Sequence, residues 1–510
     1  MPDLDVPAKS PLSGHSSFWP RLIFGLLWVL AIAKVLAITV ADPDLWGYLA
    51  FGRLFWETGR FPYQDVFAYT PTLSPWVYHE WLTGVVFYPL YRFAGAAGLQ
   101  LLKYALAVGT LVLLYLAARR RGAEPLAAAL MIWMVQLFLE MGYSPVRAQV
   151  FTYFFFALSL YWLERARDTG SRWCLLGLVF LQIPWSNLHG GFLAGLGLIA
   201  LYAVGERLSG RPCKPYLVAF GLAGLASLVN PYGFYYWKYL LPAVTMDRPQ
   251  ITEWFSFLQA YRSGLPLESW LYLAAVTLFV ILLAVWARWR DLTAWLVLGV
   301  TLYLGIRHQR HQVFFFLAVG AYLPQPLSLF LASLRARPRL QQAGRRLGWA
   351  VPCCLALLLS AAYAHGLVSR GPLGLTLPAL PDPHNHQAVY YPLGAVRHIQ
   401  AHALKGRLLT EFSWGEYLLW TLYPTCKVAL DGRFETVYPE TVAQKYWNFI
   451  YGRDTWRRFL EDYPPDLILV DPRSRVTAFL LREPGWVRVY ADAGSVLFLR
   501  SDNLAAERGH

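Results

Sequence analysis

Long apolar runs separated by short polar stretches are the feature that most constrains this sequence. A helix needs about 20 mostly apolar residues to cross the hydrocarbon core of a bilayer. About eleven runs that could form such helices occur between the two ends of the chain. They lie near Trp19–Val40, Leu99–Ala118, Leu126–Met141, Val150–Leu163, Trp173–Pro184, Gly191–Val204, Tyr216–Val229, Trp270–Trp286, Ala294–Ile306, Val313–Leu334 and Gly348–Leu367. The sequence therefore predicts a polytopic α-helical membrane protein.

Composition supports this class and excludes others. Hydrophobic residues make up 56% of the 510 residues and charged residues only 15%, whereas soluble proteins carry about 25% charged residues. The five cysteines show no pairing pattern or metal-ligand spacing, which argues against a disulfide framework or a zinc site. A formal net charge of +14 could indicate nucleic-acid binding. The basic residues cluster between apolar runs instead, so we predict no nucleic-acid partner.

The positions of these basic clusters predict the orientation of the chain. Lys and Arg in short loops mark the cytoplasmic side of a membrane. If the short apolar segment His79–Phe93 lies in the interface and does not span, all five clusters fall on one side. The clusters are Arg119–Arg121, Arg165–Arg172, Arg207–Lys214, Arg288–Arg290 and Arg335–Arg346. We therefore predict an inner-membrane protein with its N-terminus, residues 1–19, in the cytoplasm.

The same reasoning divides the chain into domains. A transmembrane domain is predicted over 20–370, with a first outer loop at 41–98. A Pro- and His-rich linker over 371–386 precedes a small extracytoplasmic α/β domain at 387–510, in which helices and strands alternate. Two segments of this domain lie at or next to predicted strand ends, where ligand contacts are common, although a turn and a packing aromatic explain them nearly as well. They are Ser413–Tyr417 and Asp431–Glu435.

The first outer loop begins with the strongest local motif, Ala41-Asp42-Pro43-Asp44-Leu45-Trp46. Carboxylates next to lipid are costly and need a reason. Asp42 and Asp44 are therefore candidate catalytic carboxylates and candidate ligands of a divalent cation such as Mg²⁺ or Mn²⁺, or else they form a solvated turn. His79 and Glu80 form a second titratable pair in the same loop, as a candidate substrate-binding and a candidate catalytic residue, or as a helix cap.

Cationic and imidazole side chains on the other predicted outer segments are candidates for substrate and phosphate binding. Arginine suits bidentate contact with phosphate, and positive charge near a departing phosphate would stabilise it. The same residues could instead anchor lipid headgroups, and a histidine at a helix turn could simply pack between helices. The candidates are Arg147, His189, Arg307, His308 and Arg310.

In these features the membrane half, roughly 20–370, resembles the GT-C superfamily of membrane glycosyltransferases. That superfamily includes protein O-mannosyltransferases, oligosaccharyltransferases and lipid A aminoarabinose transferases. The resemblance lies in topology, loop architecture and the Asp42-Pro43-Asp44 placement. It implies transfer of a sugar from a polyprenyl-phosphate carrier to a lipid, glycan or protein acceptor on the outer face.

Three hypotheses remain at this point. The first is an inverting-type glycosyltransferase in which Asp42 or Asp44 acts as the general base for the acceptor hydroxyl. The second is a transporter or flippase of a lipid-linked glycan. Transporters commonly carry charges near the midplane and internal repeats, and neither pattern is visible here. The third is a non-catalytic assembly subunit of the membrane.

Overall fold

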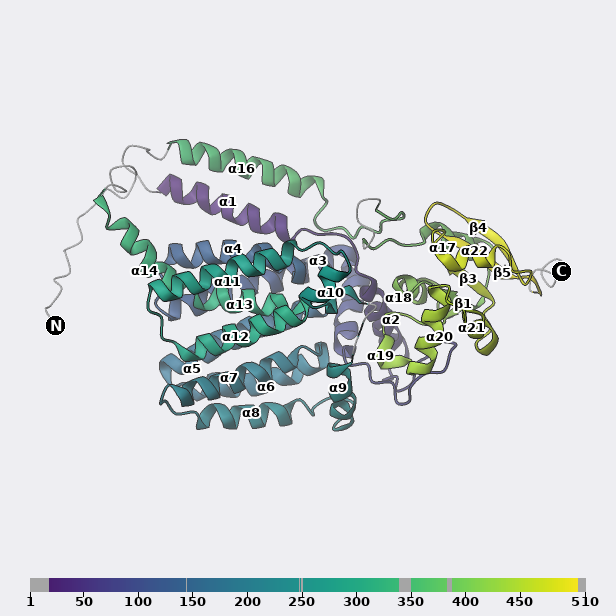
Figure 1. Cartoon of the computed structure of the whole chain (residues 1–510), viewed down its shortest axis with the longest axis horizontal. Helices are drawn as coiled ribbons and strands as arrows, with labels where there is room; N and C mark the ends of the chain where they lie inside the picture. Colours follow the sequence, from purple (N-terminus) through teal and green to yellow (C-terminus); the bar gives the residue numbers. More distant parts are fainter. Residues whose placement is uncertain are drawn as a thin grey trace.

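The computed structural model describes residues 18–143, 145–246, 248, 251–338, 350–382 and 388–502. The predicted N-terminal segment 1–19 lies outside the described residues except for its last two. The same holds for 383–387 at the end of the predicted linker, and for 503–510. The chain forms a large helical bundle and a smaller domain with a sheet at one end of the bundle (Figure 1).

The bundle is built from helices that follow the predicted apolar runs. Its elements are α1 (Phe18–Leu36), α2 (Pro43–Thr58), α3 (Trp81–Arg120), α4 (Pro125–Tyr143), α5 (Gln149–Thr169), α6 (Arg172–Leu188), α7 (Phe192–Leu208), α8 (Lys214–Ala226), α9 (Tyr235–Thr245), η1 (Thr252–Trp254), α10 (Phe257–Arg262), α11 (Glu268–Trp286), α12 (Leu292–Arg307), η2 (Gln309–His311), α13 (Gln312–Tyr322), α14 (Pro324–Arg335) and α16 (Ala350–Ser369). Helices α1 and α16 pack on each other along one side of the bundle (Figure 1).

Four described helices are long and apolar enough to cross a membrane by themselves: α1, α3, α11 and the segment Pro352–Ser369 of α16. The pair Gln309–Tyr322 and Pro324–Arg335, bent by 50°, makes a fifth if it is one span. The bend falls at Pro324, whose ring cannot donate a backbone hydrogen bond to the preceding turn. The predicted number of about eleven spans exceeds this count and stays a prediction.

A break in α3 separates the predicted interfacial segment from the predicted span that follows it. Gly95 has φ 56° and ψ −147°, a conformation open to glycine and outside the helical region. The residues before the break, 81–94, pack against α2. Gly52 of α2 and Gly84 of α3 meet so closely that a side chain at either position would collide with the other helix.

Helix α2 begins at the acidic motif for local reasons. Asp42 is its N-cap, and the Asp42 Oδ1 atom accepts a hydrogen bond from the Asp44 backbone N–H at 3.0 Å. Pro43 follows at the first helical position, where its missing N–H costs nothing. The helix ends at Gly59, which is left-handed with φ 63°. The motif therefore fixes where the helix starts, as well as presenting carboxylates.

The C-terminal domain is the predicted small α/β domain. Its strands are β1 (Gly406–Thr410), β2 (Cys426–Val428), β3 (Leu467–Val470), β4 (Trp486–Ala491) and β5 (Val496–Arg500), in the order β2-β1-β3-β5-β4. Strands β2, β1 and β3 are parallel, and β5 is antiparallel to both β3 and β4. The helices are α17 (Leu393–Ala401), η3 (Phe412–Trp414), α18 (Gly415–Leu422), α19 (Phe434–Val437), α20 (Glu440–Ile450), α21 (Arg457–Asp462) and α22 (Arg475–Leu480).

The first outer loop is hydrogen-bonded to the edge of this sheet. The Tyr69 N–H donates to the Val428 carbonyl at 3.1 Å, and the Val428 N–H donates to the Phe67 carbonyl at 3.0 Å. Nearby, the buried Arg433 guanidinium pairs with both Asp65 of the loop and Asp431 of the domain. The loop and the C-terminal domain therefore form one packed unit at one end of the bundle.

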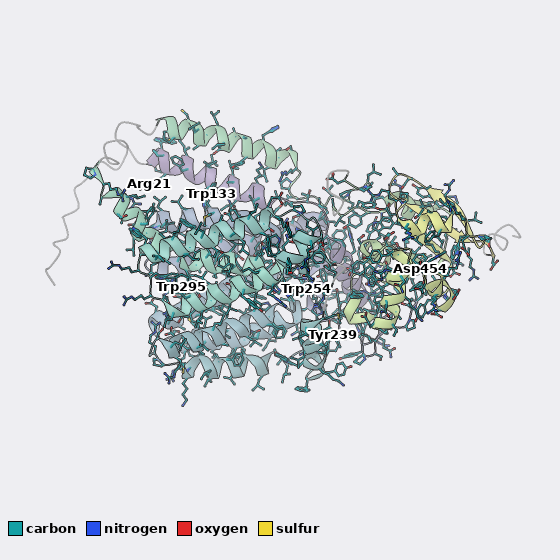
Figure 2. The ribbon with its side chains drawn as sticks, in the orientation of Figure 1. Arg21, Trp133, Tyr239, Trp254, Trp295 and Asp454 are labelled. Atoms are coloured by element: carbon teal, nitrogen blue, oxygen red, sulfur yellow. The ribbon has the colours of Figure 1, made fainter. Side chains whose placement is uncertain are left out.

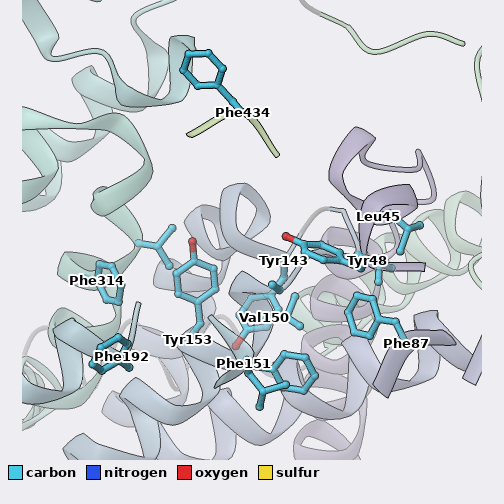
Figure 3. Packing of buried hydrophobic residues seen from close by; sticks show 14 of the residues in the cluster. Leu45, Tyr48, Phe87, Tyr143, Val150, Phe151, Tyr153, Phe192, Phe314 and Phe434 are labelled. Atoms are coloured by element: carbon cyan, nitrogen blue, oxygen red, sulfur yellow. The ribbon is translucent and has the colours of Figure 1, made fainter. Parts of the chain in front are cut away.

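Buried aromatic side chains support the same region from below (Figure 3). The rings of Tyr48 and Phe87 lie 5.9 Å apart, edge to face, where α2 meets α3. Tyr153 of α5 and Phe314 of α13 pack similarly at 5.8 Å. Such well-packed rings hold neighbouring side chains in fixed positions.

Candidate functional site

A cavity of about 750 Å³ lies where the helical bundle meets the C-terminal domain. Figure 2 shows Tyr239 and Trp254, which line it, at the end of the bundle that faces this domain. All but one of the residues predicted from the sequence line this cavity. Those residues are Asp42, Asp44, His79, Glu80, Arg147, His189, His308 and Arg310. The chain thus gathers side chains from the predicted outer segments into a single site.

The exception is Arg307. It is the last residue of α12, its side chain is exposed, and it is not among the cavity-lining residues. His308 leaves the helix in an extended conformation, with φ −145°, and this turns the following residues toward the cavity. The His308 Nδ1 atom lies 2.7 Å from the Trp254 carbonyl oxygen. The phosphate-binding role predicted for Arg307 therefore has no support from its position.

Arg147 is the centre of the charged part of the site. Its Nη2 atom donates to Asp44 Oδ2 at 2.6 Å, its Nη1 atom donates to Glu253 Oε1 at 2.6 Å, and its Nε atom lies 3.3 Å from Asp42 Oδ1. One guanidinium thus serves three carboxylates. Burial opposes the charge on Arg147, but Asp42, Glu253 and Asp44 outweigh it and hold the Arg147 pKa well above its usual value.

The two aspartates of the motif differ in how they face the cavity. The Asp42 side chain is 10% exposed and caps α2, whereas the Asp44 side chain is 33% exposed. Burial raises the pKa of Asp42 to about 8; Arg147 opposes this, while the carboxylates of Asp44 and Glu253 add to it. Burial also raises the pKa of Asp44, again against the effect of Arg147.

Glu253 is only a weaker acidic candidate in the sequence, because no second feature near it supports a role. It links Arg147 to Arg310, whose Nη1 atom lies 3.8 Å from Glu253 Oε2. Burial raises the pKa of Glu253, but Arg147 and Arg310 outweigh this and lower it to about 2. The Arg310 guanidinium also lies 4.6 Å from the centre of the Trp254 ring, within cation–π distance.

Glu80 forms a second anionic point, held by Tyr48 and two histidines. Tyr48 Oη donates to Glu80 Oε2 at 2.8 Å, while the Nε2 atoms of His79 and His189 lie 3.5 and 3.4 Å from Glu80 Oε1. Burial opposes ionisation of Glu80, yet these partners lower its pKa to about 2. Burial lowers the His189 pKa to about 3, and its Nδ1 atom accepts from the Gly191 N–H, so its proton is on Nε2.

One side of the cavity is apolar. It consists of side chains one turn apart on α7 and on the neighbouring α12, which is the spacing of a single helix face. These residues are Leu193, Ala194, Gly197, Leu198 and Leu201 on α7, with Val300, Thr301 and Leu304 on α12. The apolar side meets the charged side near Arg310, so the cavity suits an amphipathic molecule with one anionic end.

The C-terminal domain supplies the remaining wall. Residues of both segments singled out beside its predicted strand ends line the cavity. The wall consists of Val389, Phe412, Ser413, Glu416, Gly432, Arg433 and Thr436. Glu416 is 4% exposed and accepts a hydrogen bond from the Gly47 N–H of α2 at 3.0 Å. The sequence predicts that these segments lie at or next to strand ends, but it does not show that those strand ends face Asp44.

Asp42 and Asp44 are the predicted ligands of a divalent cation. Within the described parts of the chain, no group of three or more His, Cys, Asp or Glu side chains is placed to hold a metal ion. Arg147 instead contacts both Asp42 and Asp44. These residues do not fit a cation site as they stand, and a cation there stays a prediction that requires displacement of the guanidinium.

Comparison with solved structures shows a shared fold. The chain is similar to ArnT from Cupriavidus metallidurans, a crystal structure with undecaprenyl phosphate bound. The TM-score is 0.51 over 95% of this chain and 98% of that one, at 13% identity. Arabinofuranosyltransferase AftD from Mycobacteria gives 0.49 and 16% identity over 96% of this chain and 40% of its own. The similarity to ArnT is a similarity of fold over almost the whole of both chains. No family model matches the sequence, and no curated protein matches it.

Proposed function

We propose that this protein is an integral-membrane glycosyltransferase that transfers a sugar from a polyprenyl-phosphate carrier to an acceptor. The observation that carries the proposal is the composition of the single cavity. It joins an apolar wall, a pair of arginines and a row of carboxylates, which match the tail, the phosphate and the reacting sugar of such a donor. The undecaprenyl phosphate bound to ArnT, which has the same fold, supports this choice of carrier.

The donor phosphate is placed at Arg310 and His308, next to the apolar wall. Arg310 holds Glu253 only loosely, at 3.8 Å, so a phosphate can replace that carboxylate as its partner. The isoprenoid tail then lies between α7 and α12. As the bond from the anomeric carbon to the phosphate oxygen breaks, negative charge grows on the phosphate, and the fixed guanidinium stabilises it.

Asp44 is proposed as the general base. It presents more surface to the cavity than Asp42, which is committed to capping α2. The acceptor hydroxyl attacks the anomeric carbon, its proton passes to Asp44, and the phosphate leaves from the opposite face, which inverts the configuration. Arg147 orients the Asp44 carboxylate through the 2.6 Å contact. Glu80 stays anionic beside the site and is positioned to stabilise positive charge that develops on the sugar ring.

The finer topology belongs to the same proposal. About eleven spans with a cytoplasmic N-terminus put the cavity, the first outer loop and the C-terminal domain on the outer face of the inner membrane. The basic clusters then lie on the cytoplasmic side. This arrangement lets a lipid carrier enter from the bilayer and an acceptor approach from outside.

The test uses the full chain in proteoliposomes with a panel of synthetic undecaprenyl-phosphate sugars carrying labelled sugars. Washed cell envelope from a strain that lacks the protein serves as the acceptor. Wild type should transfer label from at least one donor, and the Asp42→Asn/Asp44→Asn double variant should not. Equal transfer by the double variant would overturn the proposal and favour an assembly subunit. Movement of intact lipid-linked sugar across the vesicle membrane without transfer would favour a transporter.

A further inference from the structure

Glu416 is the carboxyl that the C-terminal domain contributes to the cavity. It lies in the first turn of α18, and its Oε2 atom accepts the hydrogen bond from the Gly47 N–H of α2. The side chain crosses from one domain to the other, into the wall occupied by Asp44. Its place in the cavity is therefore set by the contact between the two domains.

Two glycines make room for this carboxyl. A Cβ atom built on Gly47 would collide with Glu416 Oε2, and one on Gly432 would lie 2.6 Å from Glu416 Oε1. The same Cβ on Gly432 would lie 3.3 Å from Asp44 Oδ1. Gly432 therefore faces both carboxyls at once. Any side chain larger than hydrogen would fill the space beside the proposed base.

Glu416 differs from the other carboxyls of the cavity in its partners. Asp42, Asp44 and Glu253 pair with arginines, and Glu80 contacts two histidines. Among the described residues, Glu416 forms no ion pair. Burial, followed by the charges of Asp44 and Asp431, raises the pKa of Glu416 well above its usual value. The Glu416 Oε1 atom lies beside Gly432, at the cavity.

The contacts that run through the cavity from Arg310 to Glu416 indicate which residues lie at its two ends. Arg310 contacts Glu253, Glu253 contacts Arg147, and Arg147 contacts Asp44. Glu416 follows beyond Asp44, on the side of the C-terminal domain. If the donor phosphate lies at Arg310, as proposed above, the base lies between the phosphate and Glu416. With the phosphate at Arg310, an attacking hydroxyl on the opposite side of the sugar approaches from the Glu416 side.

We propose that Glu416 and Gly432 form the acceptor subsite, in which the Glu416 carboxyl hydrogen-bonds a hydroxyl group of the acceptor next to Asp44. The inference rests on the proposed transferase function. The ligand class is a hydroxyl-bearing molecule, because a carboxyl group hydrogen-bonds a hydroxyl and the acceptor of a glycosyl transfer attacks through a hydroxyl. Glu416 is then a substrate-contacting residue of the C-terminal domain, and the domain selects the acceptor.

The experiment compares wild type with Glu416→Gln, Gly432→Ala and Glu411→Gln in full-length protein. Glu411 is a matched control because it is a half-buried carboxyl, five residues away, that accepts a hydrogen bond from the Asp471 N–H and is not among the cavity-lining residues. Glu416→Gln keeps an acceptor for the Gly47 N–H, so the domain contact survives. Gel filtration confirms that each variant is folded.

Two quantities are measured for each variant. The Kd of undecaprenyl phosphate reports the donor end, and the dependence of transfer rate on the amount of washed acceptor envelope gives an apparent acceptor KM. We expect Glu416→Gln and Gly432→Ala to raise the apparent KM at least tenfold and to leave the undecaprenyl phosphate Kd within twofold. Glu411→Gln should change neither quantity.

The outcomes separate the inference from the proposed function. An unchanged acceptor KM in both Glu416→Gln and Gly432→Ala, with active wild type, would overturn the inference alone. So would a loss of undecaprenyl phosphate binding in Glu416→Gln, because it would place the carboxyl at the donor end. If wild type neither binds undecaprenyl phosphate nor transfers sugar, the proposed function fails and the inference fails with it.

Discussion

Two groups of arginines and carboxylates lie at opposite ends of the helical bundle, and they are built differently. In the group away from the C-terminal domain, Arg121 pairs with Glu164 and Asp291, and Arg167 pairs with Asp291 and Glu206, at 2.7–2.9 Å. These side chains are only 4–13% exposed, and none of them lines the cavity. We call this group the closed network.

The group at the cavity contains Arg147, Arg310, Asp42, Asp44 and Glu253, and we call it the open network. One guanidinium serves three carboxylates there, and the Asp44 and Glu253 side chains are 33% and 41% exposed. A buried ion pair in which each charge has a partner holds its helices together, because removing either partner leaves a buried charge uncompensated. A network with too few cations and an open side can instead exchange its partners for a substrate. The two networks contain the same residue types, so it is openness to the cavity that distinguishes the site from the scaffold.

The largest expected effect concerns the proposed base in the open network. Asp44→Asn should lower kcat about 1,000-fold, within the range of general acid–base catalysis. Asp42→Asn should lower it less, because Asp42 mainly caps α2. Sugar transfer from the active undecaprenyl-phosphate donor measures both effects, with a thermal melt as the check on folding. A larger loss in Asp42→Asn would reverse the assignment of the base.

The next largest effect concerns the closed network. Asp291→Asn leaves Arg121 and Arg167 without their shared carboxylate, and breaking a buried pair costs about 3 kcal/mol. We expect a lower free energy of unfolding and an unchanged Kd for undecaprenyl phosphate in the protein that remains folded. The exposed pair Lys445–Asp462 provides the control, since Lys445→Ala should cost less than about 1 kcal/mol. An altered Kd in Asp291→Asn would show that the closed network also serves the substrate.

A smaller effect is expected at the phosphate end. Arg310→Ala should weaken undecaprenyl phosphate binding about tenfold, because it removes one charge-assisted hydrogen bond. Arg307→Ala is the matched control: it lies three residues away, is exposed, and is not among the cavity-lining residues. Equal losses in both variants would indicate general attraction of an anionic lipid to a basic surface, and would break the distinction between cavity and surface.

The smallest effect is a shift in pH dependence. Glu253 raises the pKa of Asp42 and shares Arg147 with the aspartate pair. Glu253→Gln removes that negative charge, so the pair should ionise at lower pH. The base must be deprotonated to act, so the acid limb of the kcat/KM profile should move down by about one pH unit. A limb that moves up or stays in place would contradict this electrostatic coupling.

Sequence reasoning succeeded where a local pattern determines the outcome. The apolar runs predicted the helices of the bundle, whereas Asp42-Pro43-Asp44 was identified as a candidate site and its role as the start of α2 appears only in the structure. Candidate residues on separate predicted outer segments were expected on one side of the membrane, and most of them line one cavity. Arg307 does not line the cavity, because α12 ends at this residue and the chain turns toward the cavity only from His308 onward.

Other features depend on distant parts of the chain and could not be predicted. Glu253 gains its role only through contact with Arg147, 106 residues earlier. Glu416 enters the site because Gly47, 369 residues away, leaves room for it. No local motif records such a pairing. The break at Gly95 was equally hidden, because a single glycine in an apolar run does not reveal its backbone angles.

The hydrogen bonds between the first outer loop and the sheet edge have a consequence for how the protein is made. The loop emerges early in synthesis, whereas its partners Val428 and Arg433 emerge more than 350 residues later. The cavity wall is therefore incomplete through most of translation, because the loop has no partner until the C-terminal domain has been made. A polypeptide that stalls or is cut before the last quarter lacks that wall altogether. The cavity is therefore complete only at the end of biogenesis, and an unfinished molecule lacks a complete site.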